Sequence, residues 1–411
     1  MRLLIKNIQT LTGVLPLDVV SLRGAEMNSA EQIHNAFLVA EDGVITRYGR
    51  MEEMGEVEAD DVVDASGRVV FPAFCDSHSH IVYAGSREGE FRDKIAGMTY
   101  EEVAARGGGI LNSADRLAEA SEDELFEAAL ARAWRMIRTG AATLEIKSGY
   151  GLTTETEIKM LRVVGRLQKA LPATVKATFL GAHAVGRAFK GRQEEYVDHV
   201  CEEMIPAVAE QGIAEFVDVF CDRGFFTPEQ TAKILECGKH YGLRPKIHAN
   251  ELASSGGVQV GIEYGALSVD HLEEANEQDV RDLAASTTMP TVLPGASFFS
   301  NLPFAPARAM IDAGLPVAIA SDCNPGSSPS GNMMLLWSLG CIKMRLSPEE
   351  ALSALTINGA AALGLSSDRG AISVGRRADL VVSKPVPSLA YLPYSFGEEL
   401  VEHTIINGKI V

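Results

Sequence analysis

The chain has no excess of basic residues and no long apolar run, and both absences narrow the classes of protein to which it can belong. Its 411 residues include 37 lysines and arginines against 55 aspartates and glutamates, which gives a net charge of −18. Because basic tracts are missing, nucleic acid and anionic membrane surfaces are not expected as partners. A run of about 18 apolar residues, the length that spans a bilayer, is missing as well. The sequence therefore predicts neither a nucleic-acid-binding protein nor a membrane protein.

Closely spaced cysteine pairs and a secretion signal are also missing. The six cysteines are scattered and form no Cys-X-X-Cys pair. This spacing argues against a disulfide framework and favours buried thiols in a reducing compartment. Residues 1–20 do not show a basic head followed by a long apolar segment and a small-residue cleavage site. We therefore predict a cytoplasmic location.

The two ends of the chain have the texture of short β-strands. The segment "NAFLVAEDGVITRYG" places an Asp-Gly turn between apolar runs, which is a hairpin signal. Near the other end, "GAISVGRRADLVVSK" and "VEHTIINGKIV" again combine apolar runs with glycine turns. Each end is too small to bury a good core by itself. We predict that residues 1–65 and 366–411 form one composite β-sandwich domain.

The middle of the chain alternates apolar β-type runs with amphipathic helical segments, such as "EDELFEAALARAWRMIRTG". Eight such runs with intervening helices are what a parallel (β/α)8 barrel requires. We therefore predict an α/β protein with a barrel domain over residues 66–365. The eight runs cover residues 68–74, 142–147, 174–180, 214–220, 243–249, 266–271, 289–293 and 316–322.

Histidines gather at the carboxyl ends of these runs, where barrels of this type place their function. Five of the nine histidines in the chain lie at or just past a predicted strand end, and an aspartate ends the eighth run. A lone histidine is usually a hydrogen-bonded core or surface residue, but that explanation does not suit such a cluster. The residues in question are His78, His80, His183, His248, His271 and Asp322.

The pair His78 and His80 starts the argument for a metal. Residues i and i+2 of a strand project from the same face, so both imidazoles can converge on one point. Histidines from the fifth and sixth runs and Asp322 from the eighth add further nitrogen and oxygen donors. Three histidines and a carboxylate match the ligand set of zinc or iron(II) and leave room for a water. Such a metal lowers the pKa of its bound water to ~7.

Seven blocks in this order resemble the amidohydrolase superfamily and, within it, the imidazolonepropionase family. The resemblance implies one divalent metal per subunit, zinc or iron, held by His78, His80, His248 and Asp322. It also implies hydrolysis of the cyclic amide C–N bond of 4-imidazolone-5-propanoate to N-formimidoyl-L-glutamate, the third step of histidine degradation. The blocks are "HSHIVYAGSREGEF", "GGGI", "EIKSGYGL", "FLGAHAVG", "HANEL", "VDHLE" and "SDCNPGS".

The resemblance also implies roles for two charged residues. Arg87 is the expected partner of the substrate carboxylate, because a guanidinium makes a bidentate fit. The alternative is a surface arginine that pairs with Glu88 or Glu90. Glu251 is expected to shuttle protons or to hold a ring nitrogen. Its alternative is a carboxylate that interacts with a helix N-terminus.

The remaining expected roles concern the ring, the attacking water and the product. Tyr150 and His183 would hydrogen-bond the ring or polarise its carbonyl. His271 would stabilise the oxygen that becomes negative, a contribution of ~3 kcal/mol for one good donor. Asp322 would orient the attacking water and accept its proton. The loop residues expected at the amino-acid end of the product are Asn324, Gly326 and Ser327.

Two further features have open interpretations. Lys147 ends the second run, and some superfamily relatives use a carbamylated lysine to bridge two metals. We instead expect Lys147 to pair with substrate or with a nearby carboxylate. The glycine-rich stretch 106–110 lacks the lysine that follows a phosphate-binding loop, so it predicts a mobile flap over the site.

Two other functions remain alternatives at this point. A single-metal deaminase of a nucleobase or related ring would use the same ligands, but it would have no propanoate for Arg87 to bind. A non-catalytic barrel that serves as a scaffold would be expected to lose ligands, whereas all four are present. A small-molecule substrate is the expected partner, and a homodimer is expected from base rates alone.

Overall fold

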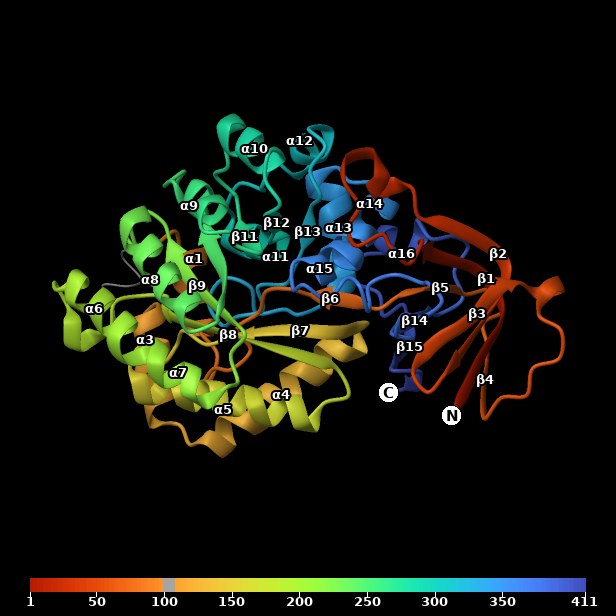
Figure 1. Cartoon of the computed structure of the whole chain (residues 1–411), viewed down its shortest axis with the longest axis horizontal. Coiled ribbons are helices and arrows are strands. Elements are labelled where there is room, and N and C mark those ends of the chain that lie inside the picture. The colour runs from red at the N-terminus through yellow and green to blue at the C-terminus, as the bar shows by residue number, and fades with distance from the viewer. Residues whose placement is uncertain (99–107) are drawn as a thin grey trace.

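Two eight-stranded sheets organise the part of the chain that the computed structural model describes, residues 1–98 and 108–411. One sheet is built from the two chain ends, and the other is the parallel sheet of a barrel. Figure 1 shows the first sheet at one end of the molecule, together with both termini, and the barrel with its helices at the other. The predicted (β/α)8 barrel with a β-sandwich made from both chain ends is confirmed.

The β-sandwich buries an apolar core with side chains such as Ile5, Leu38 and Leu380. The Asp42-Gly43 turn has positive φ at both residues and joins β2 to β3, as the sequence predicts. In sheet order the strands are β16 (Lys409–Ile410), β15 (Val401–Ile406), β14 (Leu380–Ser383), β5 (Val69–Pro72), β1 (Arg2–Val14), β2 (Glu31–Glu41) and β3 (Val44–Arg50), with β4 (Asp61–Asp64) beside β1.

The barrel sheet follows the chain order, and each strand pairs in parallel with the next. Its strands are short, because the barrel needs only enough length to stack a few layers of inward-facing side chains. They are β6 (Phe74–Asp76), β7 (Ala141–Lys147), β8 (Thr174–Ala182), β9 (Phe216–Cys221), β10 (Arg244–Ala249), β11 (Ser268–His271), β12 (Met289–Val292) and β13 (Ala318–Ile319).

The barrel closes where the first strand meets the last. A parallel bridge joins Ser79 to Cys323 just past the two strands. The backbone N–H of Asp322 donates to the carbonyl of His78 at 2.9 Å, and the N–H of His80 donates to the carbonyl of Cys323 at 2.9 Å. This seam therefore joins the segment that carries the two histidines to the segment that carries Asp322.

Helices surround the barrel sheet, and several begin where the sequence carries a capping box. Examples are Ser121 with Glu124 before α4 and Thr227 with Gln230 before α8. The helices are α1 (Glu88–Ile95), α3 (Ile110–Glu119), α4 (Glu122–Arg138), α5 (Thr154–Ala170), α6 (Gln193–His199), α7 (Ile205–Gln211), α8 (Pro228–His240), α9 (Gly257–Glu263), α10 (Glu277–Ala284), α11 (Pro294–Ser300), α12 (Ala307–Asp312), α13 (Met333–Met344), α14 (Pro348–Leu355), α15 (Ile357–Ala361) and α16 (Tyr391–Tyr394).

The first predicted barrel run is divided between the two sheets. Its residues 69–72 form β5, which pairs with β1 and β14 of the sandwich, and the barrel strand begins only at Phe74. The side chains of β5 alternate, because Val70 packs in the sandwich core whereas Val69 and Phe71 join the barrel core. The domain limits 1–65 plus 366–411 and 66–365 remain a proposal, and this pairing favours a first limit after residue 72.

Two further predictions concern membrane-spanning helices and the glycine-rich flap. Within residues 1–98 and 108–411, every helix is too short or too polar to cross a lipid bilayer. The flap predicted at residues 106–110 falls partly on residues 99–107, which lie outside the described residues.

Candidate functional site

A cavity of about 680 Å³ opens at the carboxyl ends of the barrel strands. Nearly all of the predicted site residues line it, and the side chain of His78 lies buried beneath them. The predicted residues that line the cavity are His80, Arg87, Tyr150, His183, His248, Glu251, His271, Asp322, Asn324, Gly326 and Ser327. The sequence therefore identified the mouth of the barrel as the place where its polar residues meet.

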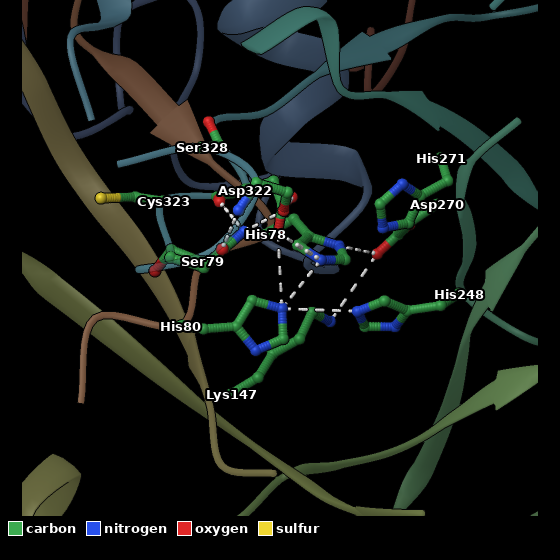
Figure 2. Close-up of polar contacts among 12 residues, drawn as sticks. His78, Ser79, His80, Lys147, His248, Asp270, His271, Asp322, Cys323 and Ser328 are labelled. Atoms are coloured by element: carbon green, nitrogen blue, oxygen red, sulfur yellow. Dashed lines mark hydrogen bonds and ion pairs between the residues drawn. The ribbon is translucent and has the colours of Figure 1, made fainter. Parts of the chain in front are cut away.

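The four predicted metal ligands converge at the floor of this cavity. His78 Nε2 lies 3.2 Å from His80 Nε2, and His248 Nε2 lies 3.4 Å from His80 Nε2. Asp322 Oδ1 is 3.5 Å from the Nε2 atoms of both His78 and His80. Figure 2 shows these side chains pointing toward one another from strands that are far apart in the sequence. The arrangement brings together three nitrogen donors and one oxygen donor.

The other ring nitrogens of His78 and His248 are held by buried carboxylates. His78 Nδ1 donates to Asp270 Oδ2 at 2.7 Å, and His248 Nδ1 lies 3.0 Å from Asp218 Oδ2. Because a carboxylate only accepts, each imidazole places its proton on Nδ1 and leaves a lone pair on Nε2. Two lone pairs therefore converge with the oxygen of Asp322 among buried side chains. This donor set fits a divalent cation, which would satisfy all of them at once.

Burial keeps the ligand imidazoles in the form that binds metal. Burial lowers the pKa of His78 well below its ordinary value, and the nearby Lys147 lowers it further. Burial also lowers the pKa of His80 well below its ordinary value, with His183 and His248 adding to the effect. Both rings are therefore neutral at physiological pH, and neutral imidazole is the ligand form.

Lys147 pairs with carboxylates, as one of its two predicted roles requires. Its Nζ lies 2.7 Å from Glu145 Oε1 and 2.8 Å from Asp218 Oδ2, with all three side chains fully buried. A carbamate at this position would carry a negative charge facing two carboxylates at hydrogen-bond distance. The contacts therefore assign an ammonium to Lys147 rather than a metal-bridging carbamate.

His271 lies between two glutamates, one of which the sequence analysis missed. Its Nε2 is 3.6 Å from Glu251 Oε2, and its Nδ1 is 3.4 Å from the fully buried Glu273 Oε2. Burial lowers the pKa of His271, but the two carboxylates outweigh burial and raise it well above its ordinary value. The sequence signal for Glu273 was its position two residues after His271, which ends a predicted strand.

Glu251 reaches the cavity from the loop after β10. Burial is the main cause that raises the pKa of its carboxyl to about 7. Its backbone N–H donates to Asp222 Oδ2 at 2.8 Å, and the N–H of Leu252 donates to the same oxygen at 2.8 Å. Asp222 therefore fixes the loop that presents Glu251, a function that the sequence analysis did not predict.

His183 and Tyr150 form one wall of the cavity. The ring of His183 stacks on that of His80, with centroids 5.3 Å apart, and Tyr150 lies 5.4 Å from His183. His183 Nδ1 lies 3.0 Å from the carbonyl of Gly149, which accepts its proton and leaves Nε2 as an acceptor. Burial lowers the pKa of His183 to about 3. The pair offers a neutral, partly aromatic surface that suits a flat heterocyclic ring.

Arg87 pairs with Glu90, one of the two glutamates considered for it, but it is not a surface residue. It forms an ion pair with Glu90 at 2.5 Å, yet its side chain is only 7% exposed and lines the cavity. Gly326 permits this packing, because a Cβ at that position would lie 2.3 Å from a guanidinium nitrogen of Arg87. The structure therefore places a buried guanidinium in the same cavity as the predicted metal ligands.

The loop after β13 is braced by its own hydrogen bonds. The Asn324 carboxamide oxygen accepts from the N–H groups of Gly326 and Ser327 at 2.7 and 2.8 Å, and its amide donates to the carbonyl of Asp322 at 2.7 Å. Ser327 Oγ donates to Asp322 Oδ2 at 3.2 Å. Asn324 therefore shapes the loop, and Ser327 orients the carboxylate of Asp322.

Backbone strain gathers at the same strand ends. His271, Leu272 and Asp322 have φ values of 85°, 69° and 48°, a left-handed region that non-glycine residues rarely adopt. Each such residue costs about 1–3 kcal/mol and persists only where the surrounding structure fixes it. The fold therefore accepts strain at the residues that carry the proposed chemistry.

The arrangement agrees with what known sequences show. Residues 69–411 match the model of the amidohydrolase family, whose members depend on metal, so the chain is an amidohydrolase. It is 51% identical to the imidazolonepropionase of Flavobacterium johnsoniae over 408 residues, which covers 99% of both chains. It is 47% identical to the imidazolonepropionase of Christiangramia forsetii, with 100% of both chains covered. Within the amidohydrolases, the chain belongs to the imidazolonepropionase family.

Solved structures support the fold at much lower sequence identity. A triazine hydrolase variant matches with a TM-score of 0.77 at 17% identity and covers 100% of this chain and 94% of its own. An E. coli guanine deaminase matches with a TM-score of 0.75 at 14% identity and covers 100% of this chain and 99% of its own. At this level of identity, these likenesses show the fold alone.

Proposed function

We propose that this hydrolase opens the ring of 4-imidazolone-5-propanoate at its cyclic amide C–N bond and releases N-formimidoyl-L-glutamate. The observation that carries the proposal is the presence, in one cavity, of a convergent His/His/His/Asp donor set and a buried guanidinium. The first supports attack by an acidified water, and the second supports a substrate with a carboxylate tail. The relatives of this chain named imidazolonepropionases support the same substrate.

We assign one zinc or iron ion per chain to His78, His80, His248 and Asp322. A divalent ion bound there would acidify water and so supply hydroxide near neutral pH. The ligands do not favour zinc over iron, since imidazole and carboxylate suit both.

The residues around the ion divide the proton transfers between them. Asp322, which Ser327 orients, is placed to accept the proton of the attacking water. Glu251, whose pKa is raised to about 7 by burial, accepts and returns protons readily at neutral pH and is placed to protonate the leaving nitrogen. His271, kept cationic between Glu251 and Glu273, is placed to stabilise the oxygen that becomes negative.

Substrate orientation falls to the opposite wall and the rim. Tyr150 and His183 offer a flat surface and hydrogen-bonding groups for the imidazolone ring. Arg87 provides the cation for the propanoate group, and its ion pair with Glu90 holds the guanidinium in place. Asn324, Gly326 and Ser327 form the loop against which the amino-acid end of the product would rest.

The test is a spectrophotometric assay of imidazolonepropanoate loss, run with and without a chelator and beside guanine and cytosine. We expect turnover of imidazolonepropanoate that the chelator abolishes, and no loss of either nucleobase. Deamination of guanine or cytosine with no turnover of imidazolonepropanoate would overturn the proposal in favour of a ring deaminase. A chain that binds no zinc or iron would favour the scaffold interpretation.

The expected oligomeric state, location and partner belong to the same proposal. A homodimer in the cytoplasm, with a small molecule as the partner, remains our expectation. Sedimentation of the purified protein tests the dimer directly.

A further inference from the structure

A layer of buried charges lies directly beneath the proposed metal ligands. Within the described part of the chain, three carboxylates and two ammonium groups meet here with fully buried side chains. Their strands are β7, β9, β10 and β11, so the layer crosses half of the barrel. The five residues are Glu145, Lys147, Asp218, Lys246 and Asp270.

Lys147 has a special place in this layer. Its Nζ lies 2.8 Å from Asp218 Oδ2 and 3.7 Å from Asp270 Oδ2. Asp218 holds Nδ1 of His248, and Asp270 holds Nδ1 of His78. One ammonium therefore contacts both of the carboxylates that set the orientation of two imidazoles of the proposed site. Figure 2 shows the contact between Lys147 and Asp270.

The geometry makes the two carboxylates depend on this cation. A buried carboxylate without a partner charge is very costly, so the loss of Lys147 would remove the contact that holds Asp218 in place. Lys246 shares the task only in part, because its Nζ bonds Glu145 and the carbonyl of Ser77 and lies 3.7 Å from Asp270. Asp218 receives its short ammonium contact from Lys147.

We propose that Lys147 is a positioning residue for the metal: through Asp218 and Asp270 it orients His248 and His78 so that their Nε2 lone pairs meet at one point. Lys147 itself is fully buried and does not line the cavity. The inference rests on the proposed metal site. Outer partners of ligand histidines typically contribute 10–100-fold to metal affinity, and we expect an effect of that size.

The test compares two variants that each remove one buried cation. Lys147→Met removes the proposed positioning group. The control is Arg369→Met, which removes a guanidinium of 5% exposure whose partners, Asp368 and Asp379, are not members of the buried layer. Zinc affinity is measured by competition with a chromophoric chelator, and the free energy of unfolding of the metal-free proteins is measured alongside. We expect K147M to bind zinc about 10–100-fold more weakly and R369M to bind it like the wild type, although both lose stability.

A double-mutant cycle then tests the route through Asp218. If Lys147 acts through this carboxylate, Asp218→Asn alone weakens zinc binding, and adding K147M to it has a much smaller effect than K147M has alone. If the two substitutions instead weaken zinc binding independently and additively, Lys147 does not act through Asp218. If K147M does not fold, D218N decides by itself, because wild-type affinity in that variant would also overturn it.

The outcomes separate this inference from the proposed function. A wild-type chain that binds neither zinc nor iron would remove the metal site itself. A wild-type chain that binds zinc, together with a folded K147M that binds it equally well, would overturn only the positioning role of Lys147.

Discussion

The apolar core of the sandwich and the polar mouth of the barrel bury opposite kinds of side chain. The sandwich core is made of alkyl groups such as Ile5, Leu38 and Leu380. The barrel mouth instead buries histidines, carboxylates and ammonium groups, including Lys147 and Asp218 with no exposed side-chain area. The first interior is stabilised by the removal of apolar surface from water. The second must offset the desolvation of its charges with short, specific contacts.

The difference indicates where each kind of interior is useful. Apolar packing is non-directional and tolerates volume-conserving changes. A buried ionic network loses several kcal/mol when one partner is removed, but it holds its members in fixed orientations. The comparison therefore predicts that substitutions in the barrel mouth change chemistry first, whereas substitutions in the sandwich change stability first.

The largest expected effect comes from Asp322→Asn. The amide keeps the size of the side chain but removes the anionic ligand and the proton acceptor. Because metal assistance contributes several kcal/mol, we expect kcat/KM to fall on the order of 10³-fold or more. Metal content per chain, measured by elemental analysis, should fall with it. Wild-type activity in a metal-free D322N protein would contradict the assignment of this residue.

Glu251→Gln should cost less and should also change the pH profile. Loss of a positioned acid–base group typically costs about 10²–10⁴-fold in kcat. Because burial raises the pKa of Glu251 to about 7, the protonated form that donates to the leaving nitrogen is lost as the pH rises through about 7. Wild-type kcat should therefore decline on the alkaline side of about 7, and E251Q should lack that decline. If E251Q keeps the same alkaline decline, another group is its cause.

Leu38→Ala is the matching change in the sandwich. Leu38 is fully buried in the apolar core, so its truncation should lower the free energy of unfolding by about 2–5 kcal/mol. Denaturant unfolding measures this loss. Metal content and KM at 25 °C should match the wild type, and a large change in either would break the proposed separation between the two sheets.

Arg87→Ala should have the smallest effect of the four, and the effect should fall mainly on KM. A charged hydrogen bond to a carboxylate contributes about 1.5–3 kcal/mol, which corresponds to a roughly 10–100-fold rise in KM. Arg187→Ala removes an exposed guanidinium that pairs with Asp115 and serves as the control. R187A should leave KM unchanged, since an exposed ion pair adds at most about 1 kcal/mol to stability. Unchanged kinetics in R87A would contradict its role as the carboxylate partner.

Much of the architecture could be predicted because its signals are local. Alternating apolar runs and helical segments identify the barrel strands, and the Asp42-Gly43 turn identifies a hairpin. The position of His78, His80, His248 and Asp322 at strand ends is enough to bring them together, since parallel strands of a barrel end at one mouth.

The features that were missed depend on partners far away in the sequence. The apolar run 68–74 does not reveal that Val69–Pro72 pairs with the sandwich, because both sheets accept apolar strands. The carboxylates that hold the ligand imidazoles are single acidic residues inside apolar runs, Asp218 in "FVDVF" and Asp270 in "SVDH". Their partners become visible only when strands β7, β9, β10 and β11 are placed side by side.

A metal ion at the proposed site would also link the two strands that close the barrel. Three of its four ligands, His78, His80 and Asp322, lie on the two segments that meet at this seam. An ion bound there would act as a removable cross-link between parts of the chain more than 240 positions apart. Stripping the ion should thus let β6 and β13 separate before the rest of the barrel, with amide hydrogens near residues 74–80 and 318–323 exchanging earliest.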